Sequence, residues 1–412
     1  MSQPPDRDAV RRRTFLAGAG AAALAGLAAC SPADEGGDQP TDGASPVPFR
    51  SARQLGVLRE PMAAGAVAAF DVAVADRAEL AETLQVVSTE IERIMAGGEA
   101  LAADAILPPP DAGIVDAAVG TAGTAITLGV GASLFDQRFG LADRLPAELI
   151  PMPRFFNDRL VQPERSDGDL VVLISSPSPQ AVLYALQQLV RVGGRRLKLR
   201  WAQEGYNDLL PPEADSIART RNLMGFRDGT SNLAVTNESA MNEHVWVQTT
   251  DDEPDWAADG TYLAVRTIRM LIEFWSTTAL VRQEQIIGPH RGTGAPLGQQ
   301  AEGDEPAFAQ DPNDETIPRR AHIRLANPRT TGTARILRRG FSYMNGVDQA
   351  GTLDQGLLFL AFQRSLNNGF LAVQQALNGE PMEDYIKPVG GGLYFVLPGP
   401  ADDGWLGQDL LT

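Results

Sequence analysis

The chain has 412 residues, 43% apolar and 21% charged, which is long enough for two or three domains with a substantial core. Its 52 Asp and Glu residues outnumber its 35 Lys and Arg, and the net charge of −17 argues against nucleic acid or an anionic lipid surface as a main partner. One Cys excludes a disulfide framework and any multi-cysteine zinc or iron–sulfur site. The three His confine imidazole chemistry to His244, His290 or His322.

Residues 1–29 resemble an export signal. Arg12 and Arg13 precede x-Phe-Leu, as in a twin-arginine signal, and the apolar stretch that follows is shorter than the ~20 residues of a spanning helix. The closing Leu-Ala-Ala-Cys resembles a lipobox and predicts lipidation of Cys30. The alternatives are an ordinary secretory signal and a chance thiol beside a conventional cleavage site. Residues 30–48 have almost no large apolar groups and predict a flexible tether.

The following segments predict a β-α-β-β-α-β order. Residues 66–75 read as a strand. Asp76 and Glu79 form a capping box, and apolar residues at spacings of three and four indicate a helix to Met95. The later elements are strands over 126–130, 169–175 and 196–201 and a helix from Ser178-Pro179 to Val190. This order is the ferredoxin-like pattern.

The second half repeats the pattern. It predicts strands over 261–270, 356–363 and 393–397 and helices over 273–287 and 366–377. The run Leu-Tyr-Ala-Leu-Gln-Gln-Leu from residue 183 is echoed by Leu-Ala-Val-Gln-Gln-Ala-Leu from residue 371. An internal duplication therefore predicts an α+β fold with an N-terminal ferredoxin-like domain over 49–215 and a C-terminal one over 216–412.

Three segments of the second half carry candidate chemistry. Residues 225–231 read Gly-Phe-Arg-Asp-Gly-Thr-Ser, where two glycines let the backbone approach a flat ligand beside a carboxylate. Residues 322–329 read His-Ile-Arg-Leu-Ala-Asn-Pro-Arg, and residues 337–343 read Leu-Arg-Arg-Gly-Phe-Ser-Tyr. Taken singly, the alternatives are an Asp-Gly turn, a structural His and a solvated basic face.

In this order the three segments resemble the dye-decolorising (DyP-type) haem peroxidase family, and are closest to its exported, EfeB-like, iron-uptake-associated branch. The resemblance covers the whole mature chain. It implies tandem ferredoxin-like domains with antiparallel sheets, of the dimeric α+β barrel type, and haem in the C-terminal half. It also implies an enzyme that reduces hydrogen peroxide and oxidises bulky organic donors (dyes, phenols or porphyrinogens) through a ferryl intermediate.

The resemblance implies individual roles as well. His322 would be the proximal ligand of the iron in one haem b, and Asp228 the distal residue that moves the peroxide proton. Arg338 would supply the distal positive charge, with Arg339 as the alternative. The implied haem contacts are Gly229, Thr230, Ser231, His322, Asn327, Pro328, Arg329 and Arg338. An aspartate, with an ordinary pKa of about 3.9, predicts an acidic activity optimum.

Two points come from the residues around this pattern. A proximal His usually has a carboxylate or carbonyl partner, and we predict Asp311 for that role, with Asp314 as the alternative. Pro289 and His290 replace a basic residue of the family's Gly-Arg-x-Lys-x-Thr-Gly-Ala-Pro-Leu stretch, so no haem contact is assigned there.

The resemblance implies further partners and a location. The partners are hydrogen peroxide, an organic electron donor, and an iron-uptake permease with its periplasmic partner; a homodimer stays open. Membrane attachment would be through the lipid anchor alone, at the outer face of the plasma membrane, or the protein would be periplasmic or extracellular. Two alternative functions also stay open: deferrochelatase-like release of iron from haem, and a non-catalytic haem-binding lipoprotein.

Overall fold

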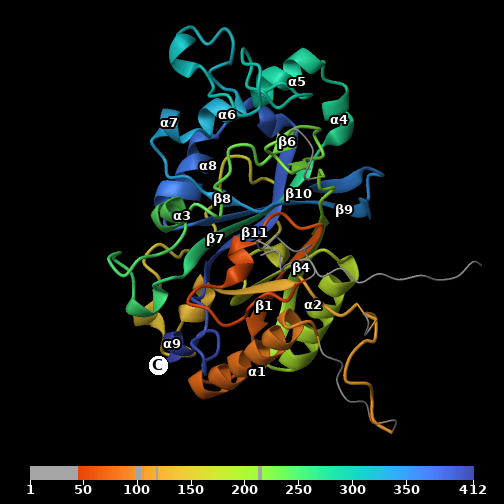
Figure 1. Ribbon diagram of the computed structural model, residues 1–412, viewed down its shortest axis with the longest axis vertical. Coiled ribbons are helices and arrows are strands. Elements are labelled where there is room, and N and C mark those ends of the chain that lie inside the picture. Colours follow the sequence, from red (N-terminus) through yellow and green to blue (C-terminus); the bar gives the residue numbers. More distant parts are fainter. Residues whose placement is uncertain (1–44, 99–103, 105, 117–118, 212–215) are drawn as a thin grey trace, which may run out of the picture. The chain divides into compact units, whose positions relative to one another are not determined.

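Eight antiparallel strands close into a ring in the order β7-β11-β2-β3-β1-β4-β9-β10, because β10 also pairs with β7 (Figure 1). The computed structural model describes residues 45–98, 104, 106–116, 119–211 and 216–412. Within them, helices cover the outside of the ring and a ninth short strand, β8, pairs with β10. The predicted α+β fold with antiparallel sheets is confirmed.

The first half of the ring is ferredoxin-like. It comprises β1 (Ala64–Val72), α1 (Arg77–Met95), β2 (Ala125–Gly131), β3 (Leu170–Ser176), α2 (Pro179–Gly193) and β4 (Leu197–Tyr206), in the sheet order β2-β3-β1-β4. Asp76 accepts a hydrogen bond from the N–H of Glu79 at 2.9 Å, and the Glu79 carboxylate accepts one from the N–H of Ala75 at 2.8 Å. Ser178 accepts from the N–H of Ala181 at 3.3 Å. These caps begin both helices where the sequence predicts them.

The second half has the equivalent order β11-β7-β10-β9. Its main strands are β7 (Thr261–Met270), β9 (Phe341–Val347), β10 (Leu353–Gln363) and β11 (Ile386–Val396). The short elements are β5 (Thr220–Arg221), β6 (Arg227–Asp228), β8 (Leu337–Arg338), α3 (Glu238–His244), α4 (Ile272–Ser276), α5 (Leu280–Ile287), α6 (His322–Leu325), α7 (Pro328–Thr331), α8 (Ala372–Ala376) and α9 (Gln408–Leu411). The sequence pattern misses β9, because residues 344–347 are exposed and do not alternate.

Both helices predicted in the second half are interrupted. The helix predicted over 273–287 is divided into α4 and α5, because Ser276 and Thr277 bond their hydroxyls to the carbonyls of Glu273 (2.9 Å) and Phe274 (2.8 Å). The helix predicted over 366–377 begins as a π-turn over 367–371, where Gly369 leaves helical geometry at φ −100° and ψ −109°. Local polar bonds and one glycine thus override the apolar spacing.

The predicted export signal, with Arg12, Arg13 and Cys30, lies outside the described residues, as does most of the predicted tether. The last tether residues are packed rather than free. Val47 is buried, and its N–H donates to the carbonyl of Met95 at 3.2 Å. The predicted domain boundary between residues 215 and 216 adjoins residues 212–215, which are not described either.

The ring encloses an apolar core to which both halves contribute. Its members from the ring strands are Val67, Ala69, Val171, Leu173, Trp201, Leu263, Val265, Phe341, Leu358, Leu360, Phe362, Tyr394 and Val396. Gly65 and Gly205 make room for the Phe341 ring, because a Cβ at Gly65 would lie 2.4 Å from its Cζ. A second cluster packs α1 and α2 against the outer face of the first-half strands. One interior core therefore joins the two halves.

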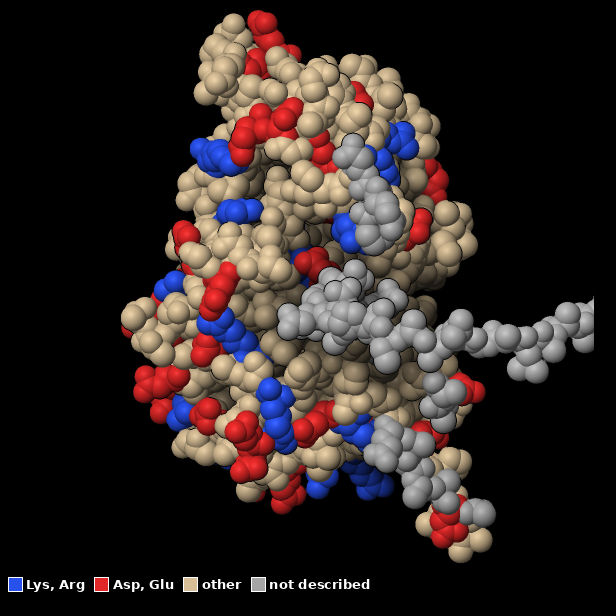
Figure 2. All heavy atoms as spheres, in the orientation of Figure 1, with Lys and Arg blue, Asp and Glu red and all other residues tan. Residues whose placement is uncertain are grey.

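On the face drawn in Figure 2, basic and acidic side chains are interspersed. Among its described residues this face offers no extended basic surface of the kind that nucleic acid requires. Within the described part of the chain, every helix is too short or too polar to cross a lipid bilayer.

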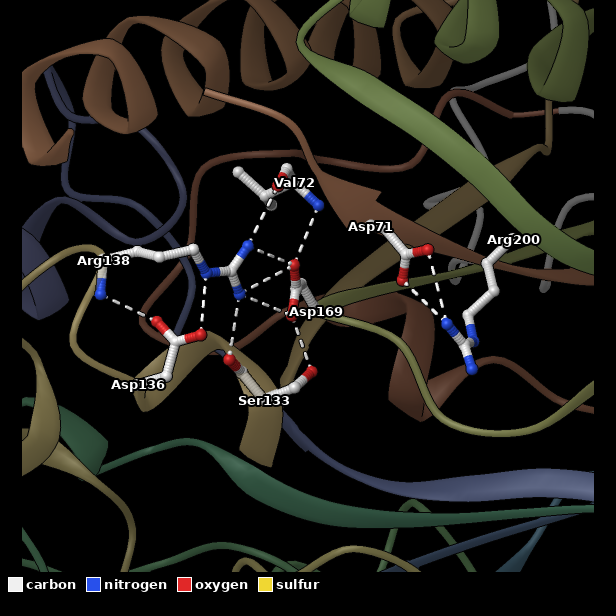
Figure 3. A network of polar contacts seen from close by, with 7 residues as sticks. All are labelled: Asp71, Val72, Ser133, Asp136, Arg138, Asp169 and Arg200. Atoms are coloured by element: carbon white, nitrogen blue, oxygen red, sulfur yellow. Dashed lines mark hydrogen bonds and ion pairs between the residues drawn. The ribbon is translucent and has the colours of Figure 1, made fainter. Parts of the chain in front are cut away.

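A buried aspartate ties strand ends of the first half together (Figure 3). Asp169 accepts from the N–H of Val72 at 2.9 Å, from the hydroxyl of Ser133 at 2.6 Å, and from Arg138 at 3.0 and 3.1 Å. Arg138 also donates to Asp136 at 2.7 Å. In the second ion pair in the figure, Arg200–Asp71 at 3.3 Å, the carboxylate is 36% exposed, against 6% for Asp169.

We expect Asp169→Ala to lower the free energy of unfolding by about 3 kcal/mol, because it leaves a guanidinium and a backbone N–H without their buried acceptor. The matched Asp71→Ala change should cost at most about 1 kcal/mol, since it removes a solvent-screened pair. Thermal or urea unfolding of both variants measures the difference. Equal losses would show that Asp169 contributes no more than a surface charge.

Candidate functional site

Asp228 lies on a short hairpin formed by β5 and β6. Thr220 pairs with Asp228 and Arg221 with Arg227. The turn between the strands includes Gly225, whose φ of +88° is one that L side chains rarely adopt. The hairpin therefore presents Asp228 from a tight, glycine-dependent turn.

Apolar side chains anchor this hairpin on one side only. Met224 and Phe226 lie in a small core with Trp275, whose indole N–H donates to the Met224 carbonyl at 2.9 Å. Asp228 and Gly229, in contrast, are only half-buried. Apart from chain neighbours, no described atom lies within 4 Å of the position that a Cβ on Gly229 would take. The Asp228–Gly229 step therefore borders open space.

A buried carboxylate, Glu302, holds the hairpin from behind. It accepts hydrogen bonds from Ala218 N (2.8 Å), Ile217 N (3.1 Å), Ser216 Oγ (3.1 Å), Thr230 Oγ1 (2.7 Å) and the Arg227 guanidinium. Burial acts to raise the pKa of Glu302, but these hydrogen bonds outweigh it and the net pKa lies below the usual value. The ionised Glu302 carboxylate thus binds Arg227, before Asp228 in the chain, and Thr230, after it. We call this contact the Glu302 clamp.

Strand β8 presents Arg338 beside this loop. Arg338 pairs with Ala361 of β10. On the other edge of β8, the Asn232 side chain accepts from Arg338 N at 2.9 Å and donates to Arg338 O at 2.8 Å. Because side chains alternate along a strand, Arg338 points to the opposite face from Leu337, which lies in the interior core of the ring.

Arg339 turns toward the interior side and is 9% exposed. Its guanidinium donates to Arg59 O at 2.6 Å and to Arg338 O at 2.9 Å. Burial lowers the pKa of Arg339 to about 10. Of these two adjacent arginines, only Arg338 points away from the interior core of the ring.

His322 begins the short helix α6, and its partner is Glu380. The imidazole Nδ1 lies 2.8 Å from Glu380 Oε2, and this carboxylate is buried in the turn after α8. Figure 1 shows α6 and α8 in the same region of the second half. A carboxylate at Nδ1 fixes the ring orientation and leaves Nε2 available to a ligand.

The predicted partners of His322 are therefore wrong. Asp311 accepts backbone N–H bonds from residues 315–317 and pairs with Arg324 at 3.0 Å, while Asp314 pairs with Arg324 at 2.8 Å and with Arg319 at 2.7 Å. Both aspartates organise their own loop. Sequence proximity to His322 was a poor guide, because the true partner is 58 residues away.

The pKa of His322 responds to three charged groups, Glu380, Arg338 and Asp228. Burial is the largest single effect and lowers the pKa of His322. Glu380 raises this pKa through its charge and its hydrogen bond, and the net pKa lies above the usual value. Arg338 lowers this pKa and Asp228 raises it, so both lie within range of the imidazole. The His322 side chain nevertheless keeps 27% of its surface accessible. The imidazole is therefore held by a buried carboxylate and still has accessible surface.

The other predicted contact residues have varied roles in the structure. Thr230 gives its hydroxyl to Glu302, and Ser231 is exposed. Asn327 caps α7 by accepting from the N–H of Arg329 at 2.9 Å, and Pro328 is the first residue of that helix. Arg329 pairs with Glu305 at 2.6 Å on the surface.

The remaining histidines make separate contacts. His290 Nδ1 lies 3.2 Å from a carboxylate oxygen of Glu284, and His244 Nε2 lies 3.8 Å from one of Glu243. In the described ranges, no group of three or more His, Cys, Asp and Glu side chains is arranged to hold a metal ion.

Sequence reasoning missed Glu380, Glu302 and Asn232. Glu380 follows Gly379 at the end of a predicted helix, and Glu302 lies in a loop, so neither had a local signal. Asn232 directly follows the Gly-Phe-Arg-Asp-Gly-Thr-Ser segment. The sequence shows that Asn232 lies four residues after Asp228, but it does not show that the Asn232 side chain binds strand β8.

We expect Glu302→Gln to lower the free energy of unfolding at pH 7 by about 1–3 kcal/mol, because the charged acceptor of Arg227 and Thr230 is lost. The pKa of Glu302 is lower in the folded chain, so its stabilisation is present above about pH 4.5 and is lost as pH falls through the folded-state pKa. The difference from wild type should therefore shrink toward pH 3.

Thermal unfolding at pH 7 and pH 3 measures this effect. Glu305→Gln is the matched control, because Glu305 lies three residues away with an exposed side chain. A loss that is independent of pH, or equal in the control, would contradict the assignment of Glu302 as an ionised clamp.

Comparison with known proteins covers nearly the whole chain. Proteins named deferrochelatase from Yersinia pseudotuberculosis and Escherichia coli O157:H7 are each 41% identical, over 99% and 97% of this chain and 96% of theirs. A DyP-type peroxidase from Streptomyces coelicolor has a TM-score of 0.82 at 33% identity, over 91% of this chain and 100% of that one. Ferric DtpA from Streptomyces lividans has a TM-score of 0.81 at 33% identity, over 90% and 98%.

The family models match each half separately. Dyp-type peroxidase, N-terminal, matches residues 54–207, and Dyp-type peroxidase, C-terminal, matches residues 219–401. The second match contains Asp228, His322, Arg338 and Glu380. The chain is an oxidoreductase that belongs to the Dyp-type peroxidase family.

Proposed function

We propose that the chain binds haem through His322 and catalyses the reduction of hydrogen peroxide with an organic electron donor. The observation that carries this proposal is the partly accessible His322 imidazole, whose Nδ1 is held by the buried Glu380 carboxylate in a chain of this family. The charges of Asp228 and Arg338, which act on this imidazole, support it. The ferric and oxyferrous forms named for DtpA from Streptomyces lividans support haem as the cofactor.

The residues present fit a haem. The accessible imidazole of His322 has its Nδ1 occupied by Glu380, so Nε2 is the nitrogen available to iron. Arg338 pairs with Ala361, and in β10 the side chain of Phe359 lies on the same face as that of Ala361. Phe359 is only half-buried, although it is a large apolar residue. A flat, largely apolar group covering this face would bury it.

Haem, when bound, supplies the electrons that cleave the peroxide O–O bond and then regains them from the donor. Asp228, directly or through a water, takes the proton from one peroxide oxygen and delivers it to the other, which leaves as water. Arg338 stabilises the negative charge that develops on the leaving oxygen, because its guanidinium is always charged. His322, with its ring oriented by Glu380, would hold the haem iron.

The finer assignments belong to this proposal. We propose one haem b per chain, contacted by Gly229, Thr230, Ser231, Asn327, Pro328, Arg329 and Arg338. We further propose twin-arginine export with Arg12 and Arg13, lipidation at Cys30 and a role in iron uptake beside a permease and its periplasmic partner. Dyes, phenols and porphyrinogens are the donor classes proposed.

The first experiment is the absorption spectrum of haem-loaded protein before and after one equivalent of hydrogen peroxide. We expect a Soret band that shifts with peroxide and is absent in His322→Ala, because that change removes the axial ligand. His290→Ala is the control and should keep the band. A Soret band that does not respond to peroxide would contradict the peroxidase function.

The same measurement tests Asp228. Asp228→Asn should keep the Soret band and slow the peroxide reaction by about 10²–10⁴-fold, because the amide cannot shuttle the proton. Asp136→Asn, an exposed position in the first half, is the control. Unchanged kinetics in Asp228→Asn would assign the distal role to Arg338 alone.

Release of iron from haem is the second candidate function, because the 41% identical relatives are named deferrochelatase. In that reaction two protons replace the iron on the pyrrole nitrogens, and Asp228 would be a proton source in the same cavity. Porphyrin fluorescence that appears in the haem-loaded protein without peroxide would favour this function. A Soret band that is stable without peroxide and shifts with it would favour the peroxidase.

We expect Glu380→Gln to weaken haem affinity by about 10-fold and to make the haem reduction potential more positive, since a neutral amide leaves the imidazole less electron-rich. Haem transfer to an acceptor protein and redox titration measure the two effects. The matched control is Glu383→Gln, which changes a buried carboxylate that instead accepts from Gly379 N at 2.9 Å. Equal effects in both variants would remove Glu380 from the axial assembly.

A further inference from the structure

We infer that Asn232 is a positioning residue that sets the separation between the Asp228 carboxylate and the Arg338 guanidinium. This inference rests on the proposed function of those two groups. It starts from the two hydrogen bonds between the Asn232 amide and the backbone of Arg338, at 2.9 and 2.8 Å. A side-chain amide that both accepts and donates to one residue replaces a neighbouring strand on that edge of β8.

Asn232 is tied equally closely to the Asp228 loop. Its backbone N–H donates to the carbonyl of Gly229 at 3.0 Å, which closes a turn directly after Asp228. Arg335 donates to the carbonyl of Asn232 at 3.1 Å. The backbone of Asn232 thus belongs to the loop, while its side chain belongs to β8.

Both chain segments are anchored beside these contacts. Leu233, next to Asn232, and Leu337, next to Arg338, are buried in the interior core of the ring. The Arg338 carbonyl also accepts from the Arg339 guanidinium at 2.9 Å. Each of the two segments is therefore anchored to the core separately. The Asn232 hydrogen bonds then determine the distance between the two segments.

The reactive side chains lack comparable restraints of their own. Among the described residues, no side-chain hydrogen bond is recorded for the Arg338 guanidinium or the Asp228 carboxylate, and both side chains are half-buried. Their placement follows from their backbones. A displacement of 1 Å at either backbone would misalign the proton transfer with the charge that stabilises it.

The test uses the haem-loaded protein and a pair of matched variants. Asn232→Leu keeps the side-chain shape and removes both hydrogen bonds. Asn207→Leu is the control, because the Asn207 amide donates to Met62 O at 3.1 Å and to Gly340 O at 3.2 Å, two residues beyond Arg338. Each variant removes a side-chain amide that donates to a carbonyl within residues 338–340, but only the Asn232 amide contacts Arg338.

Three measurements separate positioning from general destabilisation. Amide exchange of the Arg338 N–H should become about 10-fold faster in Asn232→Leu, because its acceptor is lost. Fluoride binding to the ferric protein should weaken about 10-fold, because the anion relies on the distal guanidinium. The peroxide rate constant should fall at least about 10-fold at unchanged haem occupancy. Asn207→Leu should stay within about two-fold of wild type in each.

A second variant, Asn232→Asp, keeps the proposal testable if Asn232→Leu does not fold. Asn232→Asp keeps an acceptor for Arg338 N and loses the donor to Arg338 O, so it should restore slow exchange of the Arg338 amide. Equal fluoride affinity and equal exchange in Asn232→Leu and Asn207→Leu would overturn the inference. If the wild type does not react with peroxide, the proposed function fails, while exchange and fluoride affinity still decide the role of Asn232.

Discussion

Closure of the ring is the constraint on which the rest of the structure depends. A ferredoxin-like sheet alone has two open edges, and unpaired edge strands are prone to unwanted pairing. Here β2 pairs with β11 and β4 meets β9 at Tyr206 and Ser342, so all four edges are joined. The interior of the ring then becomes one shared core, in which Gly65 and Gly205 of the first half accommodate Phe341 of the second.

This closed scaffold explains how short, irregular segments hold a site. The hairpin with Asp228, strand β8 and helix α6 each have few residues and little regular hydrogen bonding of their own. Each is instead fixed by a side chain from elsewhere: Glu302 holds the hairpin, Asn232 holds β8, and Glu380 holds His322. Buried polar groups of this kind are costly unless they are satisfied, so they define a single arrangement.

The two proposed reactions would use the same residues. In both, His322 would be the haem ligand and Asp228 the group that moves protons. The relatives named deferrochelatase and those named DyP-type peroxidase both match the chain over nearly its full length.

The sequence by itself determined the duplicated α+β pattern, the caps of α1 and α2, and the family, because caps and apolar spacing are local and three ordered motifs are specific. Only the tertiary structure decided that Glu380 rather than Asp311 or Asp314 partners His322, and that Arg339 is buried while Arg338 points away from the interior core. These outcomes depend on contacts between residues far apart in the chain and on which face of a strand each side chain occupies. Local sequence patterns carry no information on such contacts, because these form only when the closed ring brings distant segments together.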